Sequence, residues 1–379
     1  MRILLISTSF PSPDADGSEA AGSFALDFST SLSRKADVSV VCPALSRSLE
    51  KGPPEIRRFA VPRLPLGDIK PSSPASWPRI ASVLSSGQKA VDAAVDEFQP
   101  DHILALWALP SGWWARKAAG RRRIGYSTWS LGSDIWSLGR IPFVKSALRS
   151  VLAGSQCRFA DGIRLCSDVE KICGRKCLFL PSSRDLGIDT PPAKRSSPPY
   201  RLAFLGRWHR NKGIDILMEV LDMLTDADWQ MIEEVRLFGG GPLCDLVNSS
   251  AAGLQRAGRP VRTGGYIGRA EAADLLCWAD FILIPSRIES IPVILSDALQ
   301  SRTPLIVSTA GDLAELVGSS LLGVAAHGVP SPESFITAVR EALALGPSTF
   351  RDGIERTSAS FDPDGASAMF LEEIATSGR

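Results

Sequence analysis

The stretch PSRIESIP at residues 285–292 decides the fold and carries a first candidate site. It follows a short apolar run, DFILI at residues 280–284, of the kind that is buried in a parallel sheet. Pro292 suits the first turn of a helix, and residues 293–300 have helical composition. Glu289 is therefore expected at the carboxyl edge of a strand, where open α/β sheets bind ligands, with Asp297 about two helical turns further on. The alternative is that Glu289 is a solvated loop residue and Asp297 an exposed helix position.

The rest of the chain repeats this strand and helix pattern. Residues 1–7 and 38–42 are apolar runs, and the amphipathic segment 23–33 between them completes the opening of a βαβ unit. Further short apolar runs are separated by helix-length segments, and they lie at residues 101–106, 123–127, 162–166, 177–180, 201–205, 235–238 and 304–308. The predicted fold class is α/β, with doubly wound parallel sheets.

Length and a linker-like segment predict two domains. The chain has 379 residues, whereas single domains usually have about 100 to 200. Residues 181–200 are rich in proline, serine and charge, which is typical of an interdomain linker. We expect a Rossmann-like domain at residues 1–185, a linker at 186–199, a second α/β domain at 200–350, and C-terminal helices at 351–379 that pack back toward the first domain.

The composition indicates a globular cytoplasmic protein. Hydrophobic residues make up 44% of the chain, yet no run approaches the roughly 20 apolar residues of a membrane-spanning helix. The first residues open a strand rather than a signal peptide. The seven cysteines are an odd number, which favours free thiols in a reducing compartment.

No metal site is predicted. Four cysteines cluster without the paired spacing of zinc ligands: Cys157, Cys166, Cys173 and Cys177. The D-x-D string of metal-dependent transferases occurs at residues 14–16, 226–228 and 362–364. None of these three places is one where the predicted architecture needs a cation bound to a diphosphate.

Charge is distributed unevenly along the chain. Residues 1–190 contain 25 Lys and Arg against 18 Asp and Glu, and the remainder contains 17 against 23. A basic first half favours an anionic partner, although solvated helix faces give the same count. Residues 113–123 and 141–149 mix aromatic or apolar residues with cations, which suits peripheral docking on an anionic membrane. No nucleic-acid partner is expected.

Three glycine-rich turns follow predicted strands, and each can bring backbone amides close to a phosphate. The turn at residues 16–22 contains Gly17 and is equally compatible with a flexible loop. The turn at residues 206–213 contains Gly206 together with Arg207 and Lys212. The planar guanidinium of Arg207 and the ammonium of Lys212 can together neutralise a diphosphate without metal. The third turn, at residues 238–242, contains Gly240 and Gly241. Surface turns and tight packing are the alternatives for the last two.

Together these motifs resemble the GT-B glycosyltransferases, and specifically the large retaining family 4 with its glycosyl transferases group 1 donor domain. The resemblance covers nearly the whole chain and is strongest over residues 201–317, where five motifs follow in order. It implies two Rossmann-like domains that face each other across a cleft, with the acceptor side in residues 1–185 and the nucleotide-sugar donor side in residues 200–350.

The resemblance also implies roles for individual residues. The first acid of the family's E-x7-E motif contacts the donor sugar and the second binds the ribose, so these roles fall to Glu289 and Asp297. Arg207 and Lys212 would bind the diphosphate and act in catalysis with Glu289. The remaining donor-binding positions are Gly17, Gly206, Gly240, Gly241, Ser290 and Ile291.

The chain departs from the family pattern at several positions. Asp297 replaces the usual second Glu, and Pro292 stands where Gly is common, which removes a backbone donor. Residues 131–134 read Leu-Gly-Ser-Asp where many members have His-Gly-Ser-Asp, so the family histidine is absent. Asp134 can orient an acceptor hydroxyl or cap a helix. Of the three histidines, His102 is interpreted as structural, and His209 is expected near phosphate.

The sequence thus predicts a retaining, metal-independent transfer of a hexose-type sugar. The donor would be a nucleotide diphosphate sugar, and the acceptor a glycan or lipid-linked molecule in polysaccharide or glycolipid biosynthesis, with no cofactor. One alternative is a catalytically degenerate donor-binding subunit that supports a partner transferase. Another is a nucleotide-sugar epimerase or phosphorylase on the same fold.

Overall fold

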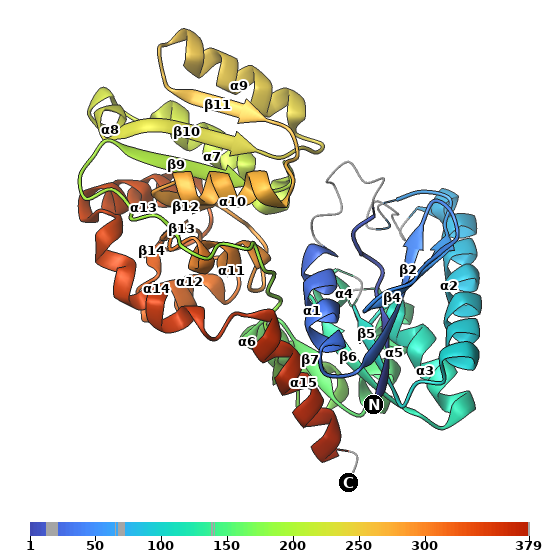
Figure 1. Cartoon of the computed structure of the whole chain (residues 1–379). Helices are drawn as coiled ribbons and strands as arrows, with labels where there is room; N and C mark the ends of the chain where they lie inside the picture. Colours follow the sequence, from blue (N-terminus) through green and yellow to red (C-terminus); the bar gives the residue numbers. More distant parts are fainter. Residues whose placement is uncertain (13–21, 65, 67–72, 138, 140, 378–379) are drawn as a thin grey trace. The chain divides into compact units, whose positions relative to one another are not determined.

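A computed structural model describes residues 1–12, 22–64, 66, 73–137, 139 and 141–377. The chain divides into two compact units (Figure 1). The first contains the described residues up to Arg184 together with the last helix, and the second is Asp185–Asp362. Each unit has its own sheet, in accordance with the predicted α/β fold.

The first unit is built on an eight-stranded sheet with the order β3-β4-β2-β1-β5-β6-β7-β8. All neighbouring strands are parallel except β3, which runs antiparallel to β4 at the sheet edge. The strands are β1 (Arg2–Ile6), β2 (Asp37–Ala44), β3 (Ser48–Glu50), β4 (Glu55–Ala60), β5 (His102–Leu106), β6 (Gly125–Ser130), β7 (Arg158–Ala160) and β8 (Leu178–Phe179). The helices are α1 (Ser23–Ser33), α2 (Trp77–Phe98), α3 (Ser111–Arg122), α4 (Ser133–Trp136), α5 (Pro142–Gly154), α6 (Ile163–Cys173) and α15 (Pro363–Ser377), with a short 3₁₀ turn at Pro74–Ser76.

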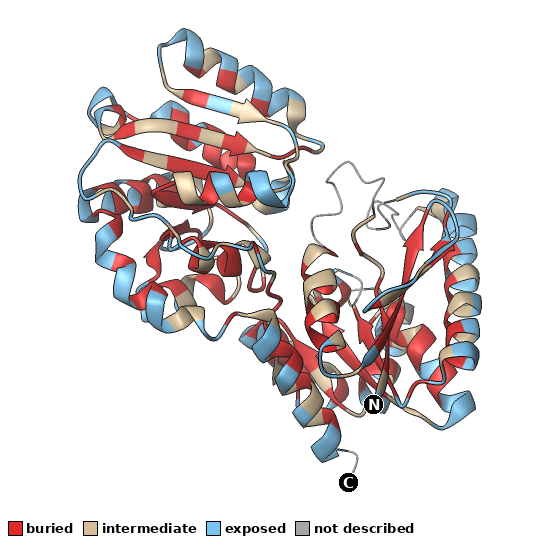
Figure 2. Cartoon of the chain, in the orientation of Figure 1, coloured by how far each residue is buried: buried red, intermediate tan, exposed pale blue. Residues whose placement is uncertain are grey.

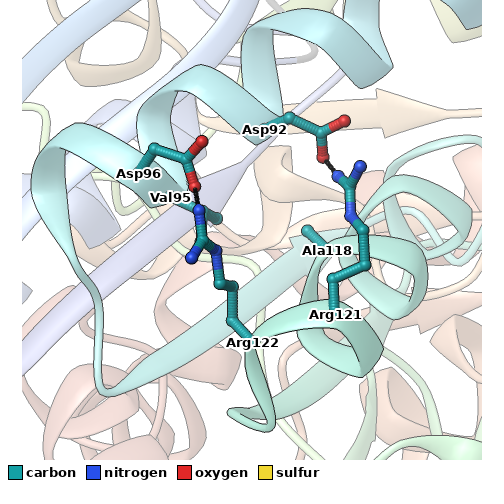
Figure 3. Close-up of a pocket in the computed structure, with 6 residues that line it drawn as sticks. All are labelled: Asp92, Val95, Asp96, Ala118, Arg121 and Arg122. Atoms are coloured by element: carbon teal, nitrogen blue, oxygen red, sulfur yellow. Dashed lines mark hydrogen bonds and ion pairs between the residues drawn. The ribbon is translucent and has the colours of Figure 1, made fainter.

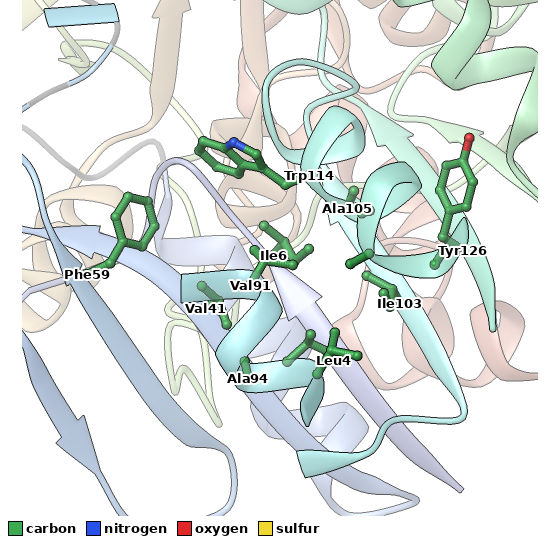
Figure 4. Close-up of a cluster of buried hydrophobic side chains, with 14 of the residues drawn as sticks. Leu4, Ile6, Val41, Phe59, Val91, Ala94, Ile103, Ala105, Trp114 and Tyr126 are labelled. Atoms are coloured by element: carbon green, nitrogen blue, oxygen red, sulfur yellow. The ribbon is translucent and has the colours of Figure 1, made fainter. Parts of the chain in front are cut away.

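The core of the first unit lies between the sheet and α2 and α3 (Figure 4). Leu4 and Ile103 on neighbouring central strands have no exposed surface, because helices cover both faces of a parallel sheet. On α2, Val83, Gly87 and Val91 are buried at intervals of four residues, which is the stripe of a helix that packs by one face. Figure 2 shows the same alternation of buried and exposed faces along the surface helices.

The second unit has a fully parallel six-stranded sheet with the order β11-β10-β9-β12-β13-β14. Its strands are β9 (Tyr200–Leu205), β10 (Ile232–Phe238), β11 (Val261–Gly264), β12 (Phe281–Ile284), β13 (Leu305–Val307) and β14 (Gly323–Ala325). Its helices are α7 (Ile214–Met223), α8 (Asp226–Gln230), α9 (Cys244–Arg256), α10 (Arg269–Trp278), α11 (Val293–Gln300), α12 (Leu313–Ser319), α13 (Pro332–Leu345) and α14 (Arg351–Ser358), with 3₁₀ turns at Arg210–Lys212 and Pro347–Phe350. The strand order reverses between β9 and β12, and such a switch point is where doubly wound sheets bind ligands.

The C-terminal segment is shared between the two units, which differs from the expectation that residues 351–379 would act together. Helix α14 stays with the second unit, where Ile354 is buried and Ser358 Oγ donates to the carbonyl oxygen of Leu299 (3.4 Å). Helix α15 packs on α1 of the first unit through Phe370, whose ring lies 6.0 Å from that of Phe28. The break at Asp362-Pro363 therefore separates two different packing partners.

One local expectation is corrected. Residues 163–166 belong to helix α6 instead of a strand, with Gly162 as its N-cap, because Leu165, Val169 and Cys173 repeat at the helical interval of four and are buried. The expected linker is anchored on the second unit: Lys194 Nζ donates to the carbonyl oxygens of Leu276, Cys277 and Ala279 at the end of α10. Burial lowers the pKa of Lys194 to about 8. Among the described residues, no helix combines the length and hydropathy of a bilayer span.

Candidate active site

The candidate site lies at the switch point of the second unit's sheet. The loop after β9 begins at Gly206 and leads through the 3₁₀ turn Arg210–Lys212 to Gly213, the N-cap of α7. The loop after β12 begins at Pro285 and leads to α11. Because β9 and β12 are parallel neighbours, both loops emerge at the same edge of the sheet.

An ion pair joins the two loops. Lys212 Nζ donates to Glu289 Oε2 at 2.5 Å, and Ser286 Oγ donates to the same oxygen at 3.1 Å. The Lys212 side chain is 38% exposed, whereas that of Glu289 is 12% exposed. The structure therefore brings together a cation and a carboxylate that lie 77 positions apart in the sequence, and their role in donor binding stays a prediction.

Two glycines allow the backbone to approach closely enough to form this pair. Gly213 has φ +68°, and a Cβ there would lie 1.9 Å from the carbonyl oxygen of Pro285. Gly311 has φ +61°, and a Cβ there would lie 1.8 Å from the carbonyl oxygen of Glu289. Any side chain at either position would push the loop after β12 away, so the position of Glu289 depends on both glycines.

Arg287 connects the two loops by hydrogen bonds beside the ion pair, a role that was not predicted from the sequence. Its Nη1 donates to the carbonyl oxygen of Arg210 at 2.8 Å and to Asp215 Oδ1 at 2.6 Å. Its backbone N–H donates to the carbonyl oxygen of Asn211 at 2.8 Å. Burial alone would raise the pKa of Asp215, but the bond from Arg287 and backbone N–H groups outweigh it and lower that pKa. The sequence feature that could have indicated this contact is Asp215 itself, an acid in the first turn of α7 two residues after Gly213.

The third glycine turn lies next to the first loop. Trp208 N donates to the carbonyl oxygen of Gly240 at 2.7 Å, and Tyr266 Oη donates to the same oxygen at 2.8 Å. Gly206 N donates to the carbonyl oxygen of Phe238 at 3.1 Å. Gly206, Gly240 and Gly241 thus lie in one region after β9 and β10. Arg207 is exposed and lies beside them, because a Cβ added to Gly241 would be 3.3 Å from Arg207 Cγ.

Other expected donor-side residues are less accessible. Ser290 and Ile291 are buried, and Asp297 lies within α11 with 1% of its surface exposed. Pro292 is the N-cap of α11, one position earlier than the first turn. The ribose contact of Asp297 stays a prediction. Gly17 lies outside the described residues.

Asp134 in the first unit is buried and bonded to backbone. Its carboxylate accepts hydrogen bonds from the N–H groups of Ala108 (2.6 Å) and Leu131 (3.2 Å), and it lies in the first turn of α4 with 1% of its surface exposed. Burial raises the pKa of Asp134 to about 6, although these backbone bonds oppose the shift. These bonds join Asp134 to backbone before and outside α4, whose N-cap is Gly132 without a side-chain cap, so the acceptor role of Asp134 stays a prediction.

Two of the histidines and one D-x-D string have structural contacts, and the string at residues 14–16 lies outside the described residues. His102 is buried against Ser127 (Nε2 to Oγ 2.9 Å), and burial lowers its pKa to about 4. His209 caps the 3₁₀ turn, with Nδ1 accepting from Asn211 N at 3.1 Å. Asp228 belongs to a capping box with Thr225 and pairs with Arg340. Within the described part of the chain, no cluster of His, Cys, Asp and Glu side chains could hold a metal ion.

The segment of α3 that was predicted for membrane docking combines a buried aromatic residue with exposed cations. Trp114 is fully buried in the first unit's core, with Nε1 donating to the carbonyl oxygen of Leu84 at 3.0 Å. The arginines at the end of α3 instead pair with acids on α2, Arg121 with Asp92 and Arg122 with Asp96, around a shallow pocket (Figure 3). Both arginine side chains stay more than half exposed in these ion pairs, so membrane contact by α3 stays a prediction.

Comparison with known proteins identifies the class. The fold matches sucrose-phosphate synthase from Thermosynechococcus elongatus with a TM-score of 0.77 at 17% identity, over 99% of this chain and 98% of that one. It also matches Anabaena HepE in complex with UDP-glucose, with a TM-score of 0.69 at 15% identity, over 99% and 100% of the two chains. The protein is a glycosyltransferase with the GT-B fold.

Sequence similarity points to the same class. Residues 199–344, the part of the chain that holds the candidate site, match the family model described as Glycosyl transferases group 1. The chain is 29% identical over 340 residues to TuaC of Bacillus subtilis (strain 168), named as a teichuronic acid biosynthesis glycosyltransferase, covering 83% of this chain and 78% of that protein. It is 30% identical over 174 residues to D-inositol 3-phosphate glycosyltransferase 1 of Catenulispora acidiphila, covering 44% and 40%.

Proposed function

We propose that the protein is a retaining, metal-independent glycosyltransferase that moves a hexose-type sugar from a nucleotide diphosphate donor to a glycan or lipid-linked acceptor. The observation that carries the proposal is the Lys212–Glu289 pair at the switch point of the second unit's sheet. A cation and a carboxylate 2.5 Å apart can serve the two ends of one ligand, with the diphosphate at Lys212 and the sugar hydroxyls at Glu289.

The pair supports catalysis by charge placement. Negative charge develops on the departing diphosphate, and groups already aimed at that charge need no reorganisation at the barrier. Lys212 supplies a point charge and Arg207 a planar fork, which is how the diphosphate would be neutralised without metal. Glu289, held by Ser286 and Lys212, would orient the sugar for attack on the face that the phosphate leaves. The departing phosphate would then accept the acceptor's proton, which fits a chain without the family histidine.

Similar proteins favour this donor and a role in glycan synthesis. HepE is known in complex with UDP-glucose, and TuaC is named for teichuronic acid biosynthesis. We extend these names to the present chain as a proposal: a nucleotide-sugar donor, and polysaccharide or glycolipid biosynthesis on the cytoplasmic side. Peripheral contact with anionic lipid would use α5, where Lys145 and Arg149 are exposed. Flotation with liposomes of rising phosphatidylglycerol content tests this contact, and binding that is independent of the anionic lipid would remove it.

The test of the transferase is Glu289→Gln, which keeps the shape of the side chain and removes its charge. Uridine, guanosine and adenosine diphosphate sugars are first screened by thermal shift, because a ligand at 100 times its dissociation constant adds about 2.7 kcal/mol. With the donor found and a glycan or lipid acceptor extract, the variant should lose about 100-fold or more in turnover. The anomeric configuration of the product is read by NMR. Full transfer by the variant, or an inverted product, would contradict the proposal.

A second reading is a donor-binding subunit without turnover. Pro292 at the N-cap of α11 provides no N–H at the start of that helix, and Asp297 is buried. Donor binding without transfer to any acceptor pool would select this reading. Release of an epimerised sugar nucleotide, or phosphate-dependent cleavage of a glycan, would point instead to an epimerase or a phosphorylase.

A further inference from the structure

The glycine turn after β10 lies between two aromatic rings. A Cβ at Gly239 would stand 3.0 Å from Trp208 Nε1, and a Cβ at Gly240 would stand 2.7 Å from the ring of Tyr266. Trp208 follows β9 and Tyr266 follows β11, so the rings come from the strands on either side of β10. The absence of side chains at Gly239 and Gly240 is what lets both rings contact the turn.

Most polar groups of the turn are already bonded. Gly239 N donates to the carbonyl oxygens of Gly264 and Gly265, both at 3.1 Å. The carbonyl oxygen of Gly240 accepts from Trp208 N and Tyr266 Oη, and Gly241 N donates to Cys244 Sγ at 3.2 Å. With respect to the described residues, the peptide that joins Gly239 to Gly240 uses neither its carbonyl oxygen nor its N–H. This peptide can therefore turn without breaking a hydrogen bond.

Trp208 carries an unsatisfied donor beside this peptide. Trp208 is 3% exposed, and its Nε1 has no hydrogen-bond partner in the described part of the protein. An indole N–H can only donate, and a buried donor without an acceptor is uncommon in folded proteins. The carbonyl oxygen of Gly239 accepts no hydrogen bond within the described residues, and a Cβ on the same residue would lie 3.0 Å from Nε1, so this oxygen is the acceptor that a turned peptide could offer to the indole.

We propose that Trp208 is a positioning residue of the donor site. When a nucleoside diphosphate binds, the Gly239–Gly240 peptide turns, its carbonyl oxygen accepts a hydrogen bond from the Trp208 indole, and its N–H donates to a phosphate oxygen. Glycines on both sides of the peptide make this rotation inexpensive, and backbone N–H groups of glycine turns are effective phosphate donors. The inference rests on the proposed function, because it requires a nucleoside diphosphate as ligand.

The experiment follows the indole N–H of Trp208 directly. The protein is labelled with ¹⁵N-tryptophan, and Trp208→Phe identifies the Trp208 signal by its loss. UDP, GDP and ADP are titrated, and the tightest binder is kept as the probe. On binding, the Trp208 indole proton should move downfield, as expected when it gains a hydrogen bond.

Affinity is then measured by calorimetry for a variant that keeps the ring shape. Trp208→benzothienylalanine replaces the N–H by sulfur, and it should bind the probe about fivefold more weakly, the range expected for one hydrogen bond. Trp229→Phe is the matched control: Trp229 is also buried in the second unit, but it packs under Arg259. Its affinity for the probe should equal that of the wild type.

The outcomes separate this inference from the proposed function. Wild-type protein that binds none of the three diphosphates would overturn both. Wild-type binding with an unmoved Trp208 signal and unchanged affinity of the benzothienylalanine variant would overturn the role of Trp208 and leave the transferase proposal intact. A merely structural tryptophan would weaken folding in Trp208→Phe without moving the indole signal on ligand binding.

Discussion

Both units have a doubly wound sheet with an acid near the carboxyl ends of its strands, but the two acids have different hydrogen-bond partners. In the second unit, Glu289 faces Lys212, and the cation is 38% exposed. In the first unit, Asp134 is 1% exposed and accepts hydrogen bonds from two backbone N–H groups. A carboxylate paired with an accessible cation can exchange that partner for a ligand, whereas one bonded to backbone stabilises the fold. Accessibility of the partner, more than the presence of an acid, distinguishes a candidate site.

The largest loss of activity is expected when the positive charge of Lys212 is removed. Lys212→Met leaves Glu289 without its ammonium partner and removes a charge from the proposed diphosphate site, so turnover should fall about 100-fold to 1000-fold. Lys171→Met is the matched control, because Lys171 pairs with Asp168 on the exposed surface of α6. Its activity should equal that of the wild type. Equal activity of both variants would mean that the ion pair has no part in transfer.

Gly213→Ala should displace the loop that carries Glu289. The alanine Cβ would overlap the carbonyl oxygen of Pro285 at 1.9 Å, in addition to the cost of a left-handed backbone. Gly258→Ala provides the control, because Gly258 has φ +76° with no atom within 4 Å of the added Cβ. We expect Gly258→Ala to lose about 1 kcal/mol of unfolding free energy, and Gly213→Ala roughly 2 kcal/mol more, together with donor binding. Urea unfolding measures both, and equal losses would show that the loop simply moves aside.

The buried acid of the first unit should appear in the pH dependence of stability. The folded pKa of Asp134 is about 6, above its ordinary value of 3.8, so the folded state binds the proton more tightly. The stability that this proton contributes is present below pH 3.8 and is lost as the pH rises through 6. Relative to Asp134→Asn, the wild type should gain roughly 2 kcal/mol as the pH falls from 7 to 4.

Urea unfolding of both proteins across this pH range measures the difference. Subtracting the variant removes the opposite contribution of His102, whose depressed pKa makes acid destabilising in both proteins. Donor affinity of Asp134→Asn should not change at pH 7. A difference in stability that stays flat with pH would place an ionised, solvated carboxylate at residue 134.

The smallest effect, on donor affinity, is expected for Arg287, which connects the two loops by hydrogen bonds. Arg287→Lys keeps a positive charge but cannot reach both the Arg210 carbonyl oxygen and Asp215 with the same planar fork. Loss of one hydrogen bond should weaken donor binding by about 1 kcal/mol, or roughly fivefold, with Lys212 and Glu289 intact. Arg236→Lys is the control, because Arg236 lies on β10 and packs over the ring of Trp278 at the end of α10. Identical donor affinities in all three proteins would remove the positioning role of Arg287.

Much of the fold was predictable because it depends on local pattern. The apolar runs of β1, β9 and β12 are short and buried on both faces, and they mark parallel strands in any such chain. Residues 162–166 were mistaken for a strand because a short apolar run has no clear period until the buried Val169 and Cys173 are included. The assignment of α14 to the second unit and α15 to the first depends on which unit each helix contacts, and local sequence carries little information about such distant contacts.

The candidate site likewise has features that the sequence predicts and features that only the tertiary structure decides. The sequence by itself determined that glycines, cations and acids follow the strands, and that Glu289 and Lys212 belong to loops at the carboxyl edge of one sheet. Only the tertiary structure decided that Arg287 bonds to Asp215, that Trp114 is core rather than surface, and that Asp134 is enclosed by backbone N–H groups. The physical reason is that residue type and spacing set what a loop can offer, whereas burial and hydrogen-bond partners depend on neighbours far away in the chain.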